Sequence, residues 1–333
     1  MWNVRGKRGE QDGQSTAVHS GVVRRAYLLL CVVTAGWGTI PVLAGHVNVP
    51  SSLVVAIRLW TAAACLGVVL IVQRRRVAPN GRPPGLFTVK PGLCVAVALI
   101  LACHWLALFA AYKRAPAGTV ILIVYLAPIG VAALAPRVLG ERVGGLTLVA
   151  LAAATAGFAL VAGPTVRSAG VAGLTLSLIA AVLFVALIMV SKPLAAVYGG
   201  LRLAFVEMAG AGLVLVPVAA FTAWPSPSPS WLWLLVLGVV HTALGITIYL
   251  GALARLPATH VGILGYLEPV GVVICAWLWL GQRPAVETVA GGFLVVAAGV
   301  LIVISATDRG QDRAGEEVTA IPSAAGPGLP SAR

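Results

Sequence analysis

Residues 253–283 read LARLPATHVGILGYLEPVGVVICAWLWLGQR, and residues 112–142 read YKRAPAGTVILIVYLAPIGVAALAPRVLGER. The two stretches align without a gap at an offset of 141 positions. The identical pairs include Pro116 and Pro257, Tyr125 and Tyr266, Pro128 and Pro269, Gly130 and Gly271, Gly140 and Gly281, and Arg142 and Arg283. A gapless match that pairs glycines and prolines indicates an internal repeat.

The composition of the chain is that of a polytopic membrane protein. Its 333 residues are 59% hydrophobic and 10% charged, with a mean hydropathy of +0.98, whereas soluble domains have about 45–50% apolar and about 25% charged residues. A membrane span needs roughly 20 apolar residues. The candidate spans are 26–45, 50–72, 91–112, 117–136, 143–163, 171–192, 201–223, 231–253, 258–280 and 285–305.

The positive residues predict the orientation of these spans. With the N-terminus in the cytoplasm, 18 of the 23 lysines and arginines fall on the inner side, four fall outside, and Arg58 lies within the membrane. This bias follows the positive-inside rule. The net charge of +13 is then explained by orientation and by contact with anionic lipids. We therefore expect a multi-pass protein of the cell inner (plasma) membrane with both termini cytoplasmic and no nucleic-acid partner.

The repeat also predicts how the two halves are arranged. It pairs the fourth span with the ninth, so the repeating unit is five spans and the halves have opposite orientations. Inverted repeats are the architecture of many secondary transporters, whose substrate site lies near the midplane between the halves. The expected organisation is a disordered cytoplasmic tail at 1–23, a first repeat at 24–164, a second at 169–305 and a second disordered tail at 306–333.

Several segments resemble the drug/metabolite transporter superfamily, specifically two EamA-type domains. These segments are AIRLWTAA (56–63), LFAAYKRAPAGTVILIVYLAPIGV (108–131), LGERV (139–143), YLGALARLPATHVGILGYLEPVGVVICAWLWLGQRP (249–284) and GGFLVVAAGVLIV (291–303). The resemblance implies an all-α integral membrane fold of ten transmembrane helices in two inverted five-helix repeats. It also implies alternating access, a central cavity lined mainly by spans one, three, four, six, eight and nine, and movement of amino acids, amines, drugs or other metabolites, often outward.

This chain departs from a symmetrical pattern at two points. The first repeat reads YLAP where the second reads YLEP, and the first reads GER at 140–142 where the second reads GQR at 281–283. Each half therefore keeps a different acid. The two halves have diverged and need not share one role.

Glu268 lies in the middle of the ninth span, where a charge is costly. A carboxyl buried without a partner tends to become neutral. One interpretation is a proton- or cation-binding group exposed alternately to each side, and the other is a structural carboxyl hydrogen-bonded across helices. Pro269 and Pro128 are expected to kink their spans, because proline frees the carbonyl four residues earlier. Gly265 and Gly271 flank Glu268 on one helix face, so a backbone or a ligand can approach closely there.

Polar and aromatic residues on other spans extend this candidate site. His104, Leu108 and Tyr112 share one face of the third span, and His241, Gly245 and Tyr249 share one face of the eighth. Each histidine either lines the cavity or makes a satisfied interhelical hydrogen bond. The candidate substrate and proton pathway is Glu268, Trp37, His104, Tyr112, His241 and Tyr249. Tyr266 lies about 200° around the helix from Glu268 and ranks lower.

Arg58 and Glu207 are the remaining deep charges, in spans two and seven. A charge at this depth must find a partner or water. We assign both a structural role, and the sequence leaves an Arg58–Glu207 pair open.

Other classes of function find little support. The five cysteines are scattered and form no ligand spacing, and no nucleotide-binding, hydrolase or metalloprotease motif is present. We expect no cofactor, no metal site and no enzymatic activity. The expected partners are a small-molecule substrate, membrane lipids and, in the coupled interpretation, protons, and a homodimer is left open. The alternatives are a uniporter or importer with Glu268 structural, a membrane enzyme acting on a lipid-linked substrate, and a receptor or scaffold.

Overall fold

A computed structural model describes residues 4–76, 85, 86, 88–162, 170–222, 224 and 230–319. Within these ranges the side chains of 4–20, 118, 230 and 307–319 are not described. The elements are α1 (Val4–Trp37), α2 (Ile40–Ala44), α3 (Ser51–Arg76), α4 (Pro91–Tyr112), α5 (Ala117–Val124), α6 (Ala127–Val138), α7 (Gly145–Ala162), α8 (Val171–Val214), α9 (Val216–Ala220), α10 (Ser230–Val236), the π-helix η2 (Leu237–Leu244), α11 (Gly245–Leu253), α12 (Ala258–Gly265), α13 (Leu267–Leu280) and α14 (Val286–Thr319). The described part of the chain is thus built from helices.

Nine helical segments in the described ranges are long and apolar enough to cross a membrane. One of them, α8, has 44 residues and would be about 66 Å long if straight, roughly twice the apolar thickness of a bilayer. It is not regular throughout, because Gly199 has non-helical angles of φ 73° and ψ 163°. This segment covers the predicted sixth and seventh spans. The protein is therefore a multi-pass helical membrane protein, and the count of ten spans stays a prediction.

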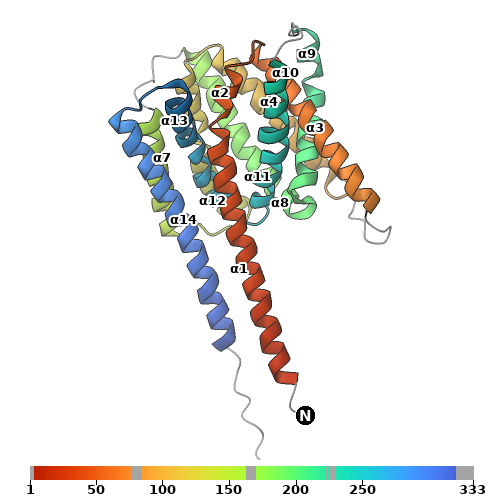
Figure 1. Ribbon diagram of the computed structural model, residues 1–333, viewed down its shortest axis with the longest axis vertical. Coiled ribbons are helices and arrows are strands. Elements are labelled where there is room, and N and C mark those ends of the chain that lie inside the picture. The colour runs from red at the N-terminus through yellow and green to blue at the C-terminus, as the bar shows by residue number, and fades with distance from the viewer. Residues whose placement is uncertain are drawn as a thin grey trace, which may run out of the picture.

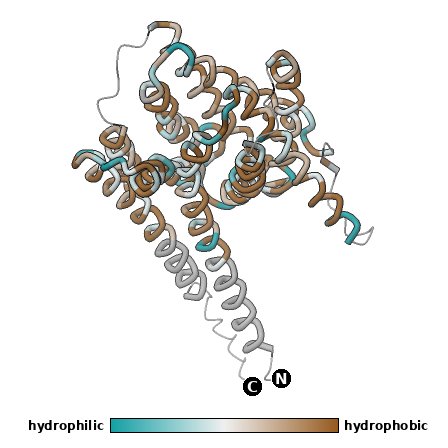
Figure 2. Tube along the Cα trace, turned by 45° about the horizontal axis from the view of Figure 1, so that its top comes forward, coloured by the Kyte–Doolittle hydropathy of each residue, from teal (hydrophilic) through white to brown (hydrophobic). Residues whose placement is uncertain are grey.

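The helices pack as one bundle (Figure 1). Figure 1 shows α1 and α14 leaving this bundle at the same end, and α14 packs along α7. Hydrophobic residues dominate the described helices in Figure 2. This distribution suits a lipid surround, where apolar side chains face outward as well as inward.

The predicted disorder of the two tails and the exact repeat boundaries stay predictions. Helix α1 begins at Val4 and α14 ends at Thr319, so both extend into the segments expected to be tails. Residues 1–3 and 320–333 lie outside the described residues.

The two repeated segments are interrupted at matched positions. In the first half α5 ends at Val124 and α6 begins at Ala127, and in the second half α12 ends at Gly265 and α13 begins at Leu267. Each break comes just before the repeated proline, Pro128 or Pro269, whose ring cannot continue the hydrogen-bonding pattern of a helix. At the expected kinks the structure has short turns, Tyr125–Leu126 in the first half and Tyr266 in the second.

The backbone of α13 touches the C-terminal end of α1 at a pair of glycines. A Cβ atom added at Gly271 would lie 2.2 Å from the carbonyl oxygen of Ala35, and one added at Gly38 would lie 2.2 Å from the carbonyl carbon of Gly271. A Cβ added at Gly265 would meet nothing within 4 Å. Of the two glycines flanking Glu268, Gly271 therefore serves backbone contact and Gly265 leaves open space.

These two glycines give a matched stability test. We expect Gly271→Ala to lower the free energy of unfolding by about 1–3 kcal/mol, because backbone atoms have to move to admit the methyl group. Gly265→Ala adds the same atoms to open space and should leave stability nearly unchanged. Thermal unfolding of the purified variants in detergent measures both. An equal loss in the two variants would contradict the close contact between α1 and α13.

Candidate functional site

Glu268 lies in the first turn of α13, directly after the break in the ninth predicted span. Its carboxyl is half-buried, and it shares a side-chain hydrogen bond with Tyr125 at the matching break in the first half. It also interacts electrostatically with Arg58, Tyr112 and Tyr249. Both halves of the chain therefore contribute to the surroundings of this carboxyl. A helix N-terminus, where backbone N–H groups point outward, is a favourable place for a carboxylate.

Arg58 of α3 faces the same region as Glu268. Its Nε donates to Thr242 Oγ1 over 3.1 Å, and its guanidinium lies 5.6 Å from the centre of the Trp105 ring. The Arg58–Glu207 pair that the sequence leaves open is not formed. Glu207 accepts a 2.6 Å hydrogen bond from Ser191 within α8 instead, and its side chain is buried.

Trp37 at the end of α1 fits against the predicted polar face of the eighth span. Its indole Nε1 donates to the carbonyl oxygen of His241 over 2.9 Å, and its ring lies 5.6 Å from that of Tyr249. A Cβ at Gly245 would come within 2.7 Å of the same indole nitrogen. The missing side chain at Gly245 thus makes room for Trp37. The ring of His241 is held at Nε2 by Thr39 over 2.7 Å.

A π-helix shapes this part of the site. Eight residues, Leu237–Leu244, form η2 and include His241 and Thr242. Such segments are rare and are found frequently at functional sites. Here η2 carries both the carbonyl that binds Trp37 and the hydroxyl that binds Arg58.

The equivalent tyrosines of the two repeats make different contacts. Tyr266 is fully buried, and its hydroxyl donates to the backbone carbonyl of Tyr125 over 2.7 Å. Thr155 Oγ1 lies 3.1 Å from the same hydroxyl. The rings of Tyr125, Tyr266 and Phe158 pack against one another with centres 4.8–5.9 Å apart. Tyr266 therefore supports the break at Tyr125, and the hydroxyl of Tyr125 is the one that reaches Glu268.

The predicted site residues divide into a central group and one outlier. Trp37, Tyr112, His241, Tyr249 and Glu268 belong to the connected region around the two breaks. His104 does not, because its Nδ1 pairs with the carbonyl of Ala180 at 2.9 Å and its ring stacks on Phe184 of α8. Across the parts of the chain that the structure describes, no three His, Cys, Asp or Glu side chains come together as metal ligands would.

The sequence does not single out Tyr125 beyond its pairing with Tyr266, and the structural role expected for Arg58 stays a prediction. The missed signal is the position of Tyr125, three residues before its proline and at the start of the break. Its partner Glu268 lies just after the matching break.

Comparison with known proteins places the chain in a family. The model of the EamA-like transporter family matches residues 24–163 and again residues 171–304. The chain belongs to the EamA-like transporter family. The two matched segments correspond to the two predicted repeats.

Two individual proteins show how this chain relates to others. It is 30% identical over 192 residues to a protein of Streptantibioticus cattleyicolor named "Probable terminal-alkyne amino-acid exporter", a match that covers 56% of this chain and 64% of that relative. The chain thus spans about two thirds of the length of the curated relative. A solved crystal structure, described only as that of a protein, superposes with a TM-score of 0.70 at 18% identity, over 83% of this chain and 96% of the other. That likeness shows the fold alone.

The Tyr266 hydroxyl provides a test of how the breaks are stabilised. We expect Tyr266→Phe to lower the free energy of unfolding by about 1–3 kcal/mol, because the half-buried carbonyl of Tyr125 loses its donor. Tyr249→Phe is the matched control, since no hydrogen bond of the Tyr249 hydroxyl is found among the described residues. Thermal unfolding of both variants in detergent is the measurement. Equal stability of the two variants would show that the Tyr266 hydroxyl is dispensable for the breaks.

Proposed function

We propose that the protein is a secondary transporter that exports small, amino-acid-like metabolites across the inner membrane by alternating access. Membership of the EamA-like transporter family and the exporter name of the curated relative support transport outward. The bias of lysines and arginines supports an orientation with both termini in the cytoplasm. Bound lipids and a homodimer stay predictions.

The pairing of Arg58 with Glu268 in one central region carries this proposal. Arg58 belongs to the first half and Glu268 to the second, and the two interact electrostatically without forming a direct ion pair within 4.0 Å among the described residues. A zwitterionic amino acid carries one carboxylate for a guanidinium and one ammonium for a carboxylate. Its side chain would lie against the neighbouring aromatic rings, Trp37, Tyr112 and Tyr249.

Glu268 also suits the proposed coupling to protons. It is the carboxyl at the centre of the region, and it is linked by hydrogen bonding or charge to residues of α3, α4, α11 and the break after α5. In the proposed cycle a proton binds Glu268 from outside, weakens its hold on the substrate ammonium and favours release or return. Moving one charge across 100 mV is worth about 2.3 kcal/mol, so one proton per cycle is a useful driving force.

The proton role is tested by Glu268→Gln in proteoliposomes. The substrate is a labelled, short apolar or alkyne-bearing L-amino acid. We expect the native protein to move it faster when the compartment into which it is released is the more acidic one. Glu268→Gln should lose this dependence on the gradient, because the amide cannot take up the proton. Uptake is measured with and without an imposed pH gradient.

Glu207→Gln is the matched control for that experiment, because Glu207 is a second deep carboxyl on α8 and is held by Ser191. It should keep the response to the gradient. An unchanged rate and an unchanged gradient response in Glu268→Gln would show that the proton role is wrong. The alternative of a uniporter or importer with a structural Glu268 would then gain support.

Substrate analogues test the assignment of the two charges. We expect Arg58→Gln to weaken competition by an amino acid roughly 10- to 100-fold but to change little for the matching amine, which lacks the carboxylate. Glu268→Gln should instead spare the matching carboxylic acid, which lacks the ammonium. Inhibition constants for the three compounds against labelled substrate give the comparison. Equal losses for all three compounds in both variants would contradict direct recognition of the zwitterion.

A further inference from the structure

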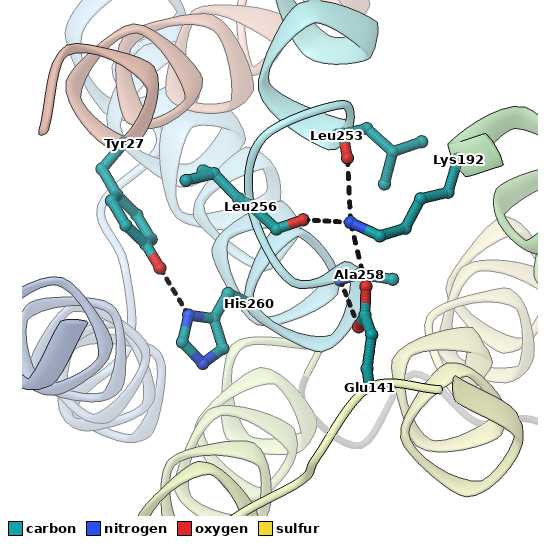
Figure 3. A network of polar contacts seen from close by, with 7 residues as sticks. All are labelled: Tyr27, Glu141, Lys192, Leu253, Leu256, Ala258 and His260. Atoms are coloured by element: carbon teal, nitrogen blue, oxygen red, sulfur yellow. Dashed lines mark hydrogen bonds and ion pairs between the residues drawn. The ribbon is translucent and has the colours of Figure 1, made fainter. Parts of the chain in front are cut away.

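A compact polar network ties the two halves together at one end of the bundle (Figure 3). The ammonium of Lys192 lies 2.9 Å from Glu141 Oε1 and donates to the carbonyls of Leu253 and Leu256 over 3.1 and 2.5 Å. The other carboxylate oxygen of Glu141 accepts from the backbone N–H of Ala258 over 2.8 Å. One lysine and one glutamate thus bind both ends of the short connection between α11 and α12.

The two side chains come from separate elements and are held in place. Glu141 follows the turn after α6, where Gly140 has φ 67° and the N–H of Glu141 returns to the carbonyl of Ala135. Lys192 lies on α8, just before Pro193. The Lys192 and Glu141 side chains are only 18% and 14% exposed. Removing one partner of a salt bridge that is this well buried is strongly destabilising, because the other charge is left unpaired.

The polarity of the network matches the ends of the helices it joins. The lysine is placed at the carbonyl of Leu253, the last residue of α11, where positive charge is favoured. The carboxylate is placed at the first N–H of α12, where negative charge is favoured. Exchanging the two charges would put each group against a helix end of its own sign. The network therefore requires each charge to occupy its own position, which a simple ion pair does not.

A second contact closes the same region from the side of α1. The Tyr27 hydroxyl lies 2.5 Å from Nδ1 of His260, two residues after Ala258, and Thr147 of α7 lies 3.5 Å from the other ring nitrogen. Tyr27, His260 and Thr147 are all buried. Helices α1, α7 and α12 are thereby joined. Figure 3 shows the Tyr27–His260 contact of this group beside the lysine–glutamate network.

The repeat does not provide the same network at the opposite end. The counterpart of Glu141 is Gln282, which follows an equivalent left-handed glycine, Gly281 with φ 66°, and makes the equivalent backbone bond to Ala276. Gln282 is exposed and carries no charge. Within the described ranges, the pair of Lys192 and Glu141 is the salt bridge that the geometry supports. Among the described residues, the salt bridge is therefore found at Glu141 and not at the matched Gln282.

We infer that Glu141 and Lys192 form the inner gate of the transporter, and that this gate is closed in the present structure. The positive-inside rule assigns this end of the bundle to the cytoplasm. Closing it blocks the route from the cytoplasm to the region around Glu268, and opening it requires the bonds to α11 and α12 to break together. The inference rests on the proposed function, because a gate has meaning only for a protein that exposes its site alternately. Because Gln282 replaces the acid at the matched position of the opposite end, we expect a resting preference for the state closed on the inside.

The gate is tested by a distance measurement that needs no substrate. Spin labels are attached at Arg137→Cys on α6 and Arg255→Cys in the α11–α12 connection, in a full-length chain whose five native cysteines are replaced by serine. Both positions are exposed, and they lie on the two segments that the network joins. Pulsed electron paramagnetic resonance in nanodiscs gives the distribution of distances between the labels. We expect one dominant short distance, and a shift of the major population to longer distances in both Glu141→Gln and Lys192→Gln.

Three further variants make the test specific. Lys192→Arg keeps a cation at the carbonyls and should retain most of the short-distance population, and Arg142→Gln removes a neighbouring exposed charge and should change nothing. The double exchange E141K/K192E should remain open, because each charge then faces a helix end of the same sign. Distances that stay short in both single neutral variants, or a double exchange that restores closure, would overturn the inference.

Size-exclusion profiles and thermal unfolding identify any variant that fails to fold, and Lys192→Arg keeps the test decisive in that case. The outcome is separable from that of the proposed function. If the gate opens as expected but the native chain moves no amino acid, the gate stands and the substrate assignment fails. If amino acids are moved and the distances never change, the gate fails and the transport function stands.

Discussion

The two repeated membrane helices are each interrupted by a turn of one or two residues, and lipid cannot hydrogen-bond backbone groups that are left free there. The remainder of the central site depends on how the protein satisfies them. At the first break the carbonyl of Tyr125 accepts a hydrogen bond from the hydroxyl of Tyr266, which lies at the second break. That bond, together with the packing of Phe158, holds the Tyr125 ring so that its own hydroxyl meets Glu268. Each half thus completes the other.

The two repeats have equivalent backbone turns but carry different side chains at key positions. Ala127 stands where the second half has Glu268, so only one break carries an acid. Glu141 stands where the second half has Gln282, so only one end of the bundle carries the lysine–glutamate network. A symmetrical pair would hold its two faces equally well. Single differences at matched positions therefore put different polar groups on equivalent backbone turns of the two halves.

Sequence reasoning predicted the features that depend on nearby residues. Apolar runs gave the helical membrane class, the offset of 141 gave the repeat, and the prolines located both breaks, because these signals act over a few residues. It did not separate Tyr125 from Tyr266 or join Lys192 to Glu141. Those contacts depend on the direction of side chains from segments far apart in the chain. The π-helix at Leu237–Leu244 was also missed, because one extra residue per turn leaves no clear mark in composition.

The contact between Gly38 and Gly271 has a mechanical consequence. Interlocked side chains resist sliding, since packed interfaces change by jumping between discrete arrangements. At this point α13 and the end of α1 meet backbone to backbone, with no side chain of either glycine between them. This contact lies one turn from Glu268, and the same absence of side chains that limits substitution there leaves α13 and α1 without interdigitating groups at this point.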